Sequence, residues 1–89
     1  MTRPVLLVAG GSRGIGAAIS KLAGARGYDV AVNYKGNEKA AQEVVAAVNA
    51  AGGQALAIKG DMAKSAEIER GFEQAAKLGA LTHFFHSSG

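Results

Sequence analysis

Glycines near the amino terminus form the pattern in this sequence that best suits a chemical role. Gly10, Gly14 and Gly16 stand at fixed spacing within residues 9–16, Ala-Gly-Gly-Ser-Arg-Gly-Ile-Gly. Gly10 permits a sharp turn at positive φ. Gly14 leaves room for a phosphate to approach the backbone, and Gly16 lets a helix pack closely on a strand. Because free N–H groups and the helix dipole attract anions at a helix start, the pattern predicts a phosphate-binding turn.

Two better-known phosphate motifs do not fit this stretch. The Walker loop requires a Gly-Lys pair, which the sequence lacks. The Gly-x-Gly-x-x-Gly fingerprint fails because Ile19 stands where the third glycine belongs. What remains is Gly-x-x-x-Gly-x-Gly. A purely structural turn without a ligand is the alternative interpretation.

The elements around this turn are predicted from hydrophobic periodicity. Val5–Ala9 is a continuous apolar run, which is typical of a strand buried on both faces. Apolar residues at helical spacing then predict a helix that ends near Gly27, with Ile15, Ala18, Ile19, Leu22 and Ala23 as its apolar face. Residues 30–32 predict a second strand that leads into residues 33–36.

Two further helices and two further strands follow. Asn37 is the expected N-cap of a helix that stops at Gly52, with Ala40, Ala41, Val44, Val45 and Val48 inward. Residues 55–58 predict the third strand. Ser65 is the expected cap of a third helix, ended by Gly79, with Ile68, Phe72, Ala75 and Ala76 inward. Residues 81–85 predict the fourth strand, so the alternation indicates an α/β fold with parallel strands and right-handed crossovers.

Composition narrows the classes of protein that the chain can represent. Its 89 residues and 9.0 kDa allow one domain, and the absence of cysteine excludes disulfides and thiolate metal sites. Two histidines are too few to predict a metal site. The net charge of +3 is concentrated in the first third, which suits an anionic ligand. No basic run indicates nucleic acid and no apolar run could span a membrane, so we expect a cytoplasmic protein.

Four segments, which together span essentially the whole chain, resemble the short-chain dehydrogenase/reductase family. Residues 9–16 resemble its Thr-Gly-x-x-x-Gly-x-Gly turn, and residues 32–35 its nucleotide-selecting position. Asp61 and Met62 resemble its adenine-binding Asp and the apolar residue that follows. Residues 86–89, His-Ser-Ser-Gly, stand where the family usually has Asn-Asn-Ala-Gly.

The resemblance implies a Rossmann-like three-layer fold that binds NAD or NADP. Its parallel sheet should have the strand order 3-2-1-4, with the first two helices on one face and the third on the other. The implied coenzyme-binding residues are Gly10, Ser12, Arg13, Gly14, Ile15, Gly16, Tyr34, Lys35, Asp61, Met62, His86 and Ser88. For His86, which replaces the family's usual Asn, the expected contact is through the backbone.

The end of the second strand favours NADP over NAD. NAD sites usually place Asp or Glu there, to accept from the ribose 2′-OH. Here Tyr34 takes that place, Lys35 follows it, and Arg13 can reach the same region from the glycine turn. Two cations with no carboxylate nearby favour a 2′-phosphate. Solvated cations without a ligand role are the alternative.

The family's catalytic residues are not found in this chain. The family uses a Ser and a Tyr-x-x-x-Lys pair, but Tyr28 and Tyr34 are followed four residues later by Val32 and Glu38. We therefore expect residues 1–89 to be the coenzyme-binding part of a longer enzyme, or else to pair with another chain through its open fourth strand. The complete enzyme should act on a small carbonyl or alcohol substrate and form a homo-oligomer.

Two other classes of function compete with this interpretation. One is a non-catalytic nucleotide-binding or regulatory module that uses the same half-fold. The other is an S-adenosylmethionine methyltransferase fragment. That class requires an acidic residue after the second strand, where Tyr34 and Lys35 stand.

Overall fold

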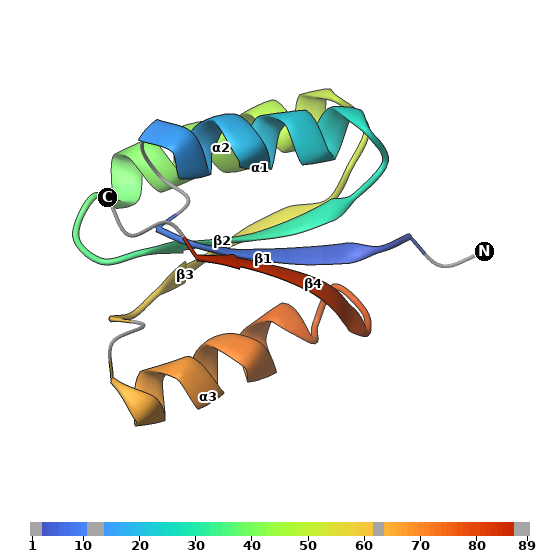
Figure 1. The fold of residues 1–89 in the computed structure, drawn as a ribbon. Coiled ribbons are helices and arrows are strands. Elements are labelled where there is room, and N and C mark those ends of the chain that lie inside the picture. Colours follow the sequence, from blue (N-terminus) through green and yellow to red (C-terminus); the bar gives the residue numbers. More distant parts are fainter. Residues whose placement is uncertain (1–2, 11–13, 62–63, 87–89) are drawn as a thin grey trace.

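The structure is a computed structural model that describes residues 3–10, 14–61 and 64–86. Four parallel strands form one sheet: β1 (Val5–Ala9), β2 (Asp29–Tyr34), β3 (Ala55–Lys59) and β4 (Leu81–His86). The strand order is β3-β2-β1-β4, which confirms the predicted order. Helices α1 (Gly14–Ala25) and α2 (Glu38–Ala50) cover one face, and α3 (Ser65–Ala75) covers the other (Figure 1). Within the described residues, no helix is long and apolar enough to span a membrane.

The two central strands carry the core. All residues of β1 and β2 are buried. The apolar runs Val5–Ala9 and Val30–Val32 predict this burial, and β2 adds the buried polar residues Asp29 and Asn33. Even-numbered side chains of β2, such as Val30 and Val32, belong to a cluster under α1 and α2. Leu7 and Ala31 point to the opposite face and pack with Ala75 of α3. The core therefore has two halves, one on each side of the sheet.

The predicted apolar face of α1 is wrong in part. Ile15 and Leu22 are 69% and 56% exposed, and Ala18 is exposed as well. Ala23 is buried as predicted and Ile19 packs, partly buried, against the cluster under α1 and α2, while the other buried residues of the helix are the small residues Gly16, Ser20 and Gly24. A Cβ on Gly24 would lie 2.9 Å from Cγ1 of Val48 on α2, so α1 and α2 approach too closely for larger side chains. Close packing of two helices thus overrides the hydrophobic periodicity of α1.

Of four predicted details of the helix ends, one is confirmed and three are wrong. Asn37 caps α2 by accepting a hydrogen bond from the Ala40 N–H at 3.0 Å, as expected. Ser65 is not the cap of α3, because Lys64 takes that place and Ser65 is the first helical residue. Helix α3 ends at Ala75, so Ala76 lies in the following turn and is exposed rather than inward. Gly79, at φ +142, belongs to this turn before β4 and does not itself end the helix.

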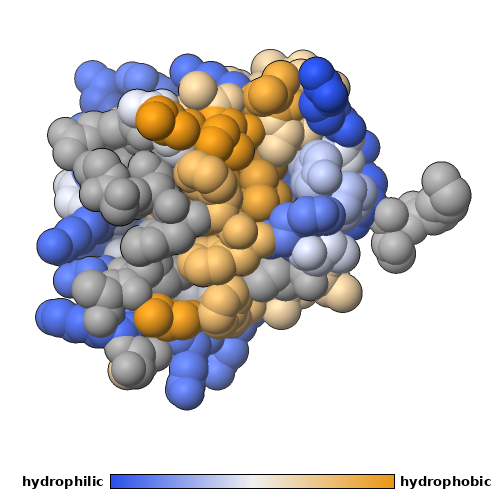
Figure 2. Space-filling view, in the orientation of Figure 1, coloured by the Kyte–Doolittle hydropathy of each residue, from blue (hydrophilic) through white to orange (hydrophobic). Residues whose placement is uncertain are grey.

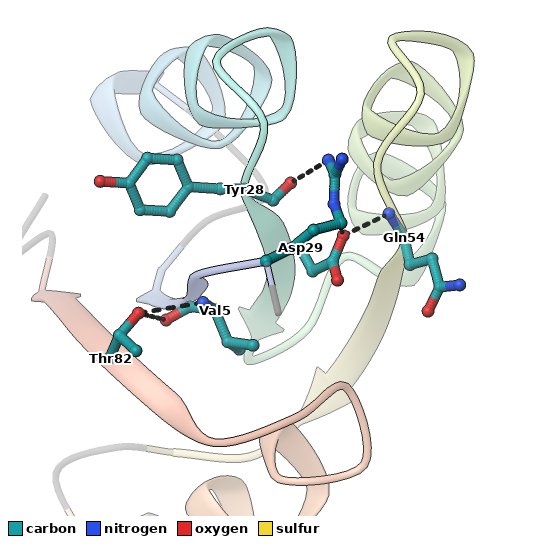
Figure 3. Close-up of polar contacts among 6 residues, drawn as sticks. Val5, Tyr28, Asp29, Gln54 and Thr82 are labelled. Carbon is teal, nitrogen blue, oxygen red and sulfur yellow. Dashed lines mark hydrogen bonds and ion pairs between the residues drawn. The ribbon is translucent and has the colours of Figure 1, made fainter. Parts of the chain in front are cut away.

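Polar contacts fasten the amino ends of the strands (Figure 3). Asp29 Oδ1 accepts hydrogen bonds from Arg3 Nε at 2.7 Å and from the Gln54 N–H at 3.0 Å. Thr82 lies at an irregularity in the β1–β4 register, and its hydroxyl bonds both the N–H and the C=O of Val5, each at 3.0 Å. A pocket of about 470 Å³ opens at this end, lined by Arg3, Pro4, Asp29, Leu78, Gly79, Ala80 and Thr82.

Strand β4 lies at an edge of the sheet, as predicted, and pairs with β1. Phe84 is 49% exposed and contacts the Phe72 ring edge-on, with ring centroids 5.5 Å apart. Phe85 is partly buried against the cluster under α1 and α2. On the side of the molecule seen in Figure 2, hydrophobic side chains gather along the middle.

Candidate coenzyme site at the carboxyl ends of the strands

The glycine turn leaves β1 at the carboxyl end of the sheet and leads into α1. Gly10 has φ +76 and Gly14 has φ +58, the left-handed region that favours glycine. Among the described residues beyond its chain neighbours, none would place a heavy atom within 4 Å of a Cβ added at Gly14, so they leave the space beside this backbone open. Gly16 is buried on the inner face of α1. The structure therefore places open backbone at the start of a helix, where an anion is favoured.

The exposed side chain of Ile15 follows Gly14 on the first turn of α1. Neither an acidic nor a basic residue occupies that first turn in α1. The backbone N–H groups of this turn are therefore its means of attracting a negative group. Ser12 and Arg13, which the sequence placed in this site, lie outside the described residues.

Tyr34 and Lys35, at the end of β2, lie in contrasting surroundings. Tyr34 is only 7% exposed and belongs to the hydrophobic cluster under α1 and α2. The side chain of Lys35 is 79% exposed. A ligand approaching from solvent therefore meets the ammonium group of Lys35 far more readily than the ring of Tyr34.

Asp61 brings a carboxylate close to Lys35, which the sequence analysis did not expect. Its Oδ2 lies 3.6 Å from Nζ of Lys35. The prediction that no carboxylate lies near Lys35 is therefore wrong, because parallel pairing of β2 and β3 brings their carboxyl ends together. The Asp61 N–H in turn donates to Oε1 of Glu67 at 2.9 Å, which ties this loop to α3. Two predicted site residues, Lys35 and Asp61, are thus brought together.

Of the three remaining predicted site residues, the structure describes only the backbone position of His86. His86 is the last residue of β4 and is paired in register with Ala9, so its backbone lies beside the start of the glycine turn. Met62 and Ser88 lie outside the described residues. In the described part of the chain, no three His, Cys, Asp or Glu side chains form a group that could hold a metal ion.

Asn33 of β2 is a residue of this region that the sequence analysis did not assign to the site. It is 4% exposed, and its carboxamide bonds backbone groups of Gly10 after β1, Ile58 near the end of β3 and Gly60 after β3. A signal was available in the sequence. Asn is depleted in strands, yet it stands here in the otherwise apolar run Val30–Tyr34. A polar residue at such a position must find hydrogen-bond partners when it is buried.

A parallel α/β sheet in this strand order, with a glycine turn between β1 and α1, defines a Rossmann-like fold. The model of the family described as short chain dehydrogenase matches residues 4–89. The chain therefore belongs to the short-chain dehydrogenase family, which is a family of oxidoreductases.

Known proteins similar to this chain are consistent with that membership. The hydroxynaphthalene reductase-like protein Arp2 of Metarhizium robertsii is 44% identical over 86 residues, which cover 97% of this chain and 30% of that protein. A short-chain dehydrogenase/reductase structure from Serratia marcescens is 40% identical with a TM-score of 0.91, covering 99% of this chain and 36% of that one. A short chain dehydrogenase from Burkholderia cenocepacia, solved in complex with NADP, is 42% identical with a TM-score of 0.85, and the match covers 93% of this chain and 34% of that one. The chain thus spans about a third of the length of these proteins.

Proposed function

We propose that this chain forms the NADP(H)-binding part of an oxidoreductase that transfers a hydride between the coenzyme and a carbonyl or alcohol substrate. The observation that carries the proposal is the open backbone at Gly14, where an added Cβ would meet no heavy atom of the other described residues within 4 Å. It lies at the start of α1, in a fold that binds dinucleotides at the carboxyl ends of its strands. The Burkholderia relative solved with NADP supports the choice of coenzyme.

Each part of the site has a proposed role toward the coenzyme. The first-turn N–H groups of α1, at Gly14, Ile15 and Gly16, would hold the pyrophosphate. Lys35 would bind the 2′-phosphate, and the Asp61 carboxylate would accept from the adenine amino group. When bound, the nicotinamide supplies or accepts the hydride. We further propose that the catalytic Ser, Tyr and Lys come from other residues of the same enzyme, which acts in the cytoplasm as a homo-oligomer.

The contact between Lys35 and Asp61 bears on the selection of the coenzyme. A phosphate carries about two negative charges near neutral pH, whereas the Asp61 carboxylate carries one. A 2′-phosphate would therefore compete well for the exposed Lys35 ammonium. NADH offers no such group, so it gains nothing from Lys35. This difference predicts a preference for NADP(H).

The proposed coenzyme is tested by titrating NADPH and NADH into the intact protein that carries this sequence. We expect both dinucleotides to bind and NADPH to bind more tightly. Fluorescence of the bound reduced nicotinamide gives both dissociation constants. Tighter binding of NADH would refute the NADP preference, and no binding of either dinucleotide would refute the proposed function.

Lys35→Ala should weaken NADPH binding about fivefold and leave NADH binding unchanged. A well-formed hydrogen bond between charged groups contributes roughly 1.5–3 kcal/mol, and the exposure of Lys35 reduces this to about 1 kcal/mol. Lys77→Ala is the matched control, because it removes the same charge from an exposed position after α3, at the opposite end of the sheet. Equal losses for NADPH and NADH in Lys35→Ala would show that this lysine does not read the 2′-phosphate.

A further inference from the structure

Asn33 stands between the two segments that would hold the coenzyme. Its Oδ1 accepts a hydrogen bond from the N–H of Gly10, the first residue of the glycine turn, at 3.2 Å. Its Nδ2 donates to the C=O of Ile58 at 3.3 Å and to the C=O of Gly60 at 3.1 Å. Gly60 directly precedes Asp61. One side chain on β2 thus spans from the end of β1 to the end of β3.

Most of the hydrogen-bonding groups of the Asn33 carboxamide have partners. Both Nδ2 donors and one Oδ1 lone pair have backbone partners. The same turn after β3 is also fixed by the Gly60 N–H, which donates to the Tyr34 C=O at 2.9 Å. Both backbone polar groups of Gly60 are therefore bonded to the last two residues of β2. The position of Asp61 relative to the glycine turn follows from these bonds.

We propose that Asn33 is a positioning residue for the coenzyme, which sets the separation between the glycine turn and the loop that carries Asp61. This inference rests on the proposed function. A dinucleotide that places its pyrophosphate at Gly14 and its adenine at Asp61 must touch both segments at once. Its affinity then depends on their being held in place before it binds. Asn33 itself is buried and acts through the backbone that it holds.

The amide is required, and a carboxylate of the same shape would not serve. An Asp at this position would accept from the Gly10 N–H but would have no hydrogen to donate. Its negative charge would face the carbonyl oxygens of Ile58 and Gly60, which repel it. Asn33→Asp should therefore release the loop after β3 while changing the size of the side chain very little.

The test compares Asn33→Asp with Thr82→Val in the intact protein. Thr82 is the matched control, because its hydroxyl also bonds the backbone of a neighbouring strand but lies at the amino ends of the strands. Thermal unfolding gives the stability of each variant, and NADPH is titrated at a temperature at which both remain folded. We expect the NADPH dissociation constant to rise at least tenfold in Asn33→Asp and to stay within twofold in Thr82→Val.

Other outcomes separate this inference from the proposed function. If the unchanged protein binds NADPH and Asn33→Asp binds it equally well, the positioning role is refuted while the proposed function stands. A rise of equal size in Thr82→Val would also refute it, because the effect would then be a general loss of structure.

If Asn33→Asp does not fold, Asn33→Ser takes its place. Its hydroxyl keeps one possible bond, so we expect a threefold or larger rise, and an unchanged constant overturns the inference. An unchanged protein that binds neither dinucleotide refutes both proposals.

Discussion

Replacing Gly14 with alanine is expected to weaken NADPH binding at least tenfold and to lower the free energy of unfolding by only about 1–2 kcal/mol. The stability cost arises because Gly14 has φ +58, where a residue with a Cβ is strained by about that amount. No clash with the rest of the described chain adds to it, since the added Cβ would meet none of its heavy atoms within 4 Å. The methyl group would instead occupy the space proposed for the coenzyme phosphates, so binding suffers more than folding.

Gly52→Ala is the matched control for this experiment. Gly52 has φ +99 and likewise has nothing within 4 Å of an added Cβ, but it follows α2 at the opposite end of the sheet. It should lose a similar amount of stability and keep its affinity for NADPH. Titration of NADPH and denaturant unfolding, carried out on both variants, measure the two quantities separately. If Gly14→Ala binds NADPH as tightly as the unchanged protein, the phosphates do not lie beside Gly14.

Leu7→Ala is expected to lower the free energy of unfolding by about 2–5 kcal/mol, as buried leucines generally do. Leu7 is fully buried at the centre of the sheet and packs with Ala31, Ile58 and Ala75 on the α3 side. Its removal leaves a cavity between the sheet and α3 that these neighbours cannot fill. For a protein of marginal stability, such a loss is a large part of the total.

Leu22→Ala makes the same change of side chain at a position that is 56% exposed on α1. Little apolar area leaves contact there, and alanine is a slightly better helix former, so the free energy of unfolding should change by about 0.5 kcal/mol or less. Urea unfolding of the two variants is the measurement. Similar losses in both would show that the outer face of α1 is covered by other residues of the protein.

The order and the types of the elements could be read from the sequence because they depend on neighbours along the chain. The unbroken apolar run of β1 predicts burial on both faces, and the structure confirms it. The cap at Asn37 and the positive φ of Gly10 are likewise local, since each depends on a few adjacent residues. The strand order followed from the resemblance to a known family together with the limited number of ways to connect parallel strands.

Apart from the errors at the two ends of α3, the errors share a different physical origin, because each depends on contacts between distant segments. The sequence alone cannot show that α1 buries its small residues, with Gly24 against Val48 of α2, since Ile15 and Leu22 fit the helical period equally well. The approach of Asp61 to Lys35 results from the pairing of β3 with β2. The hydrogen bonds of Asn33 depend on three strands ending at the same edge.

By itself, the sequence determined the glycine turn, the alternation of strands and helices, and the family that the chain resembles. Spacing and side-chain type suffice for these features, because a turn or an amphipathic element is set by residues close together in the chain. Only the tertiary structure decided which face of α1 is buried, which charges meet at the edge of the sheet, and which side chain bonds both the start of the glycine turn and the segment before Asp61. Those outcomes are set by packing distances and hydrogen bonds between residues that lie more than twenty positions apart.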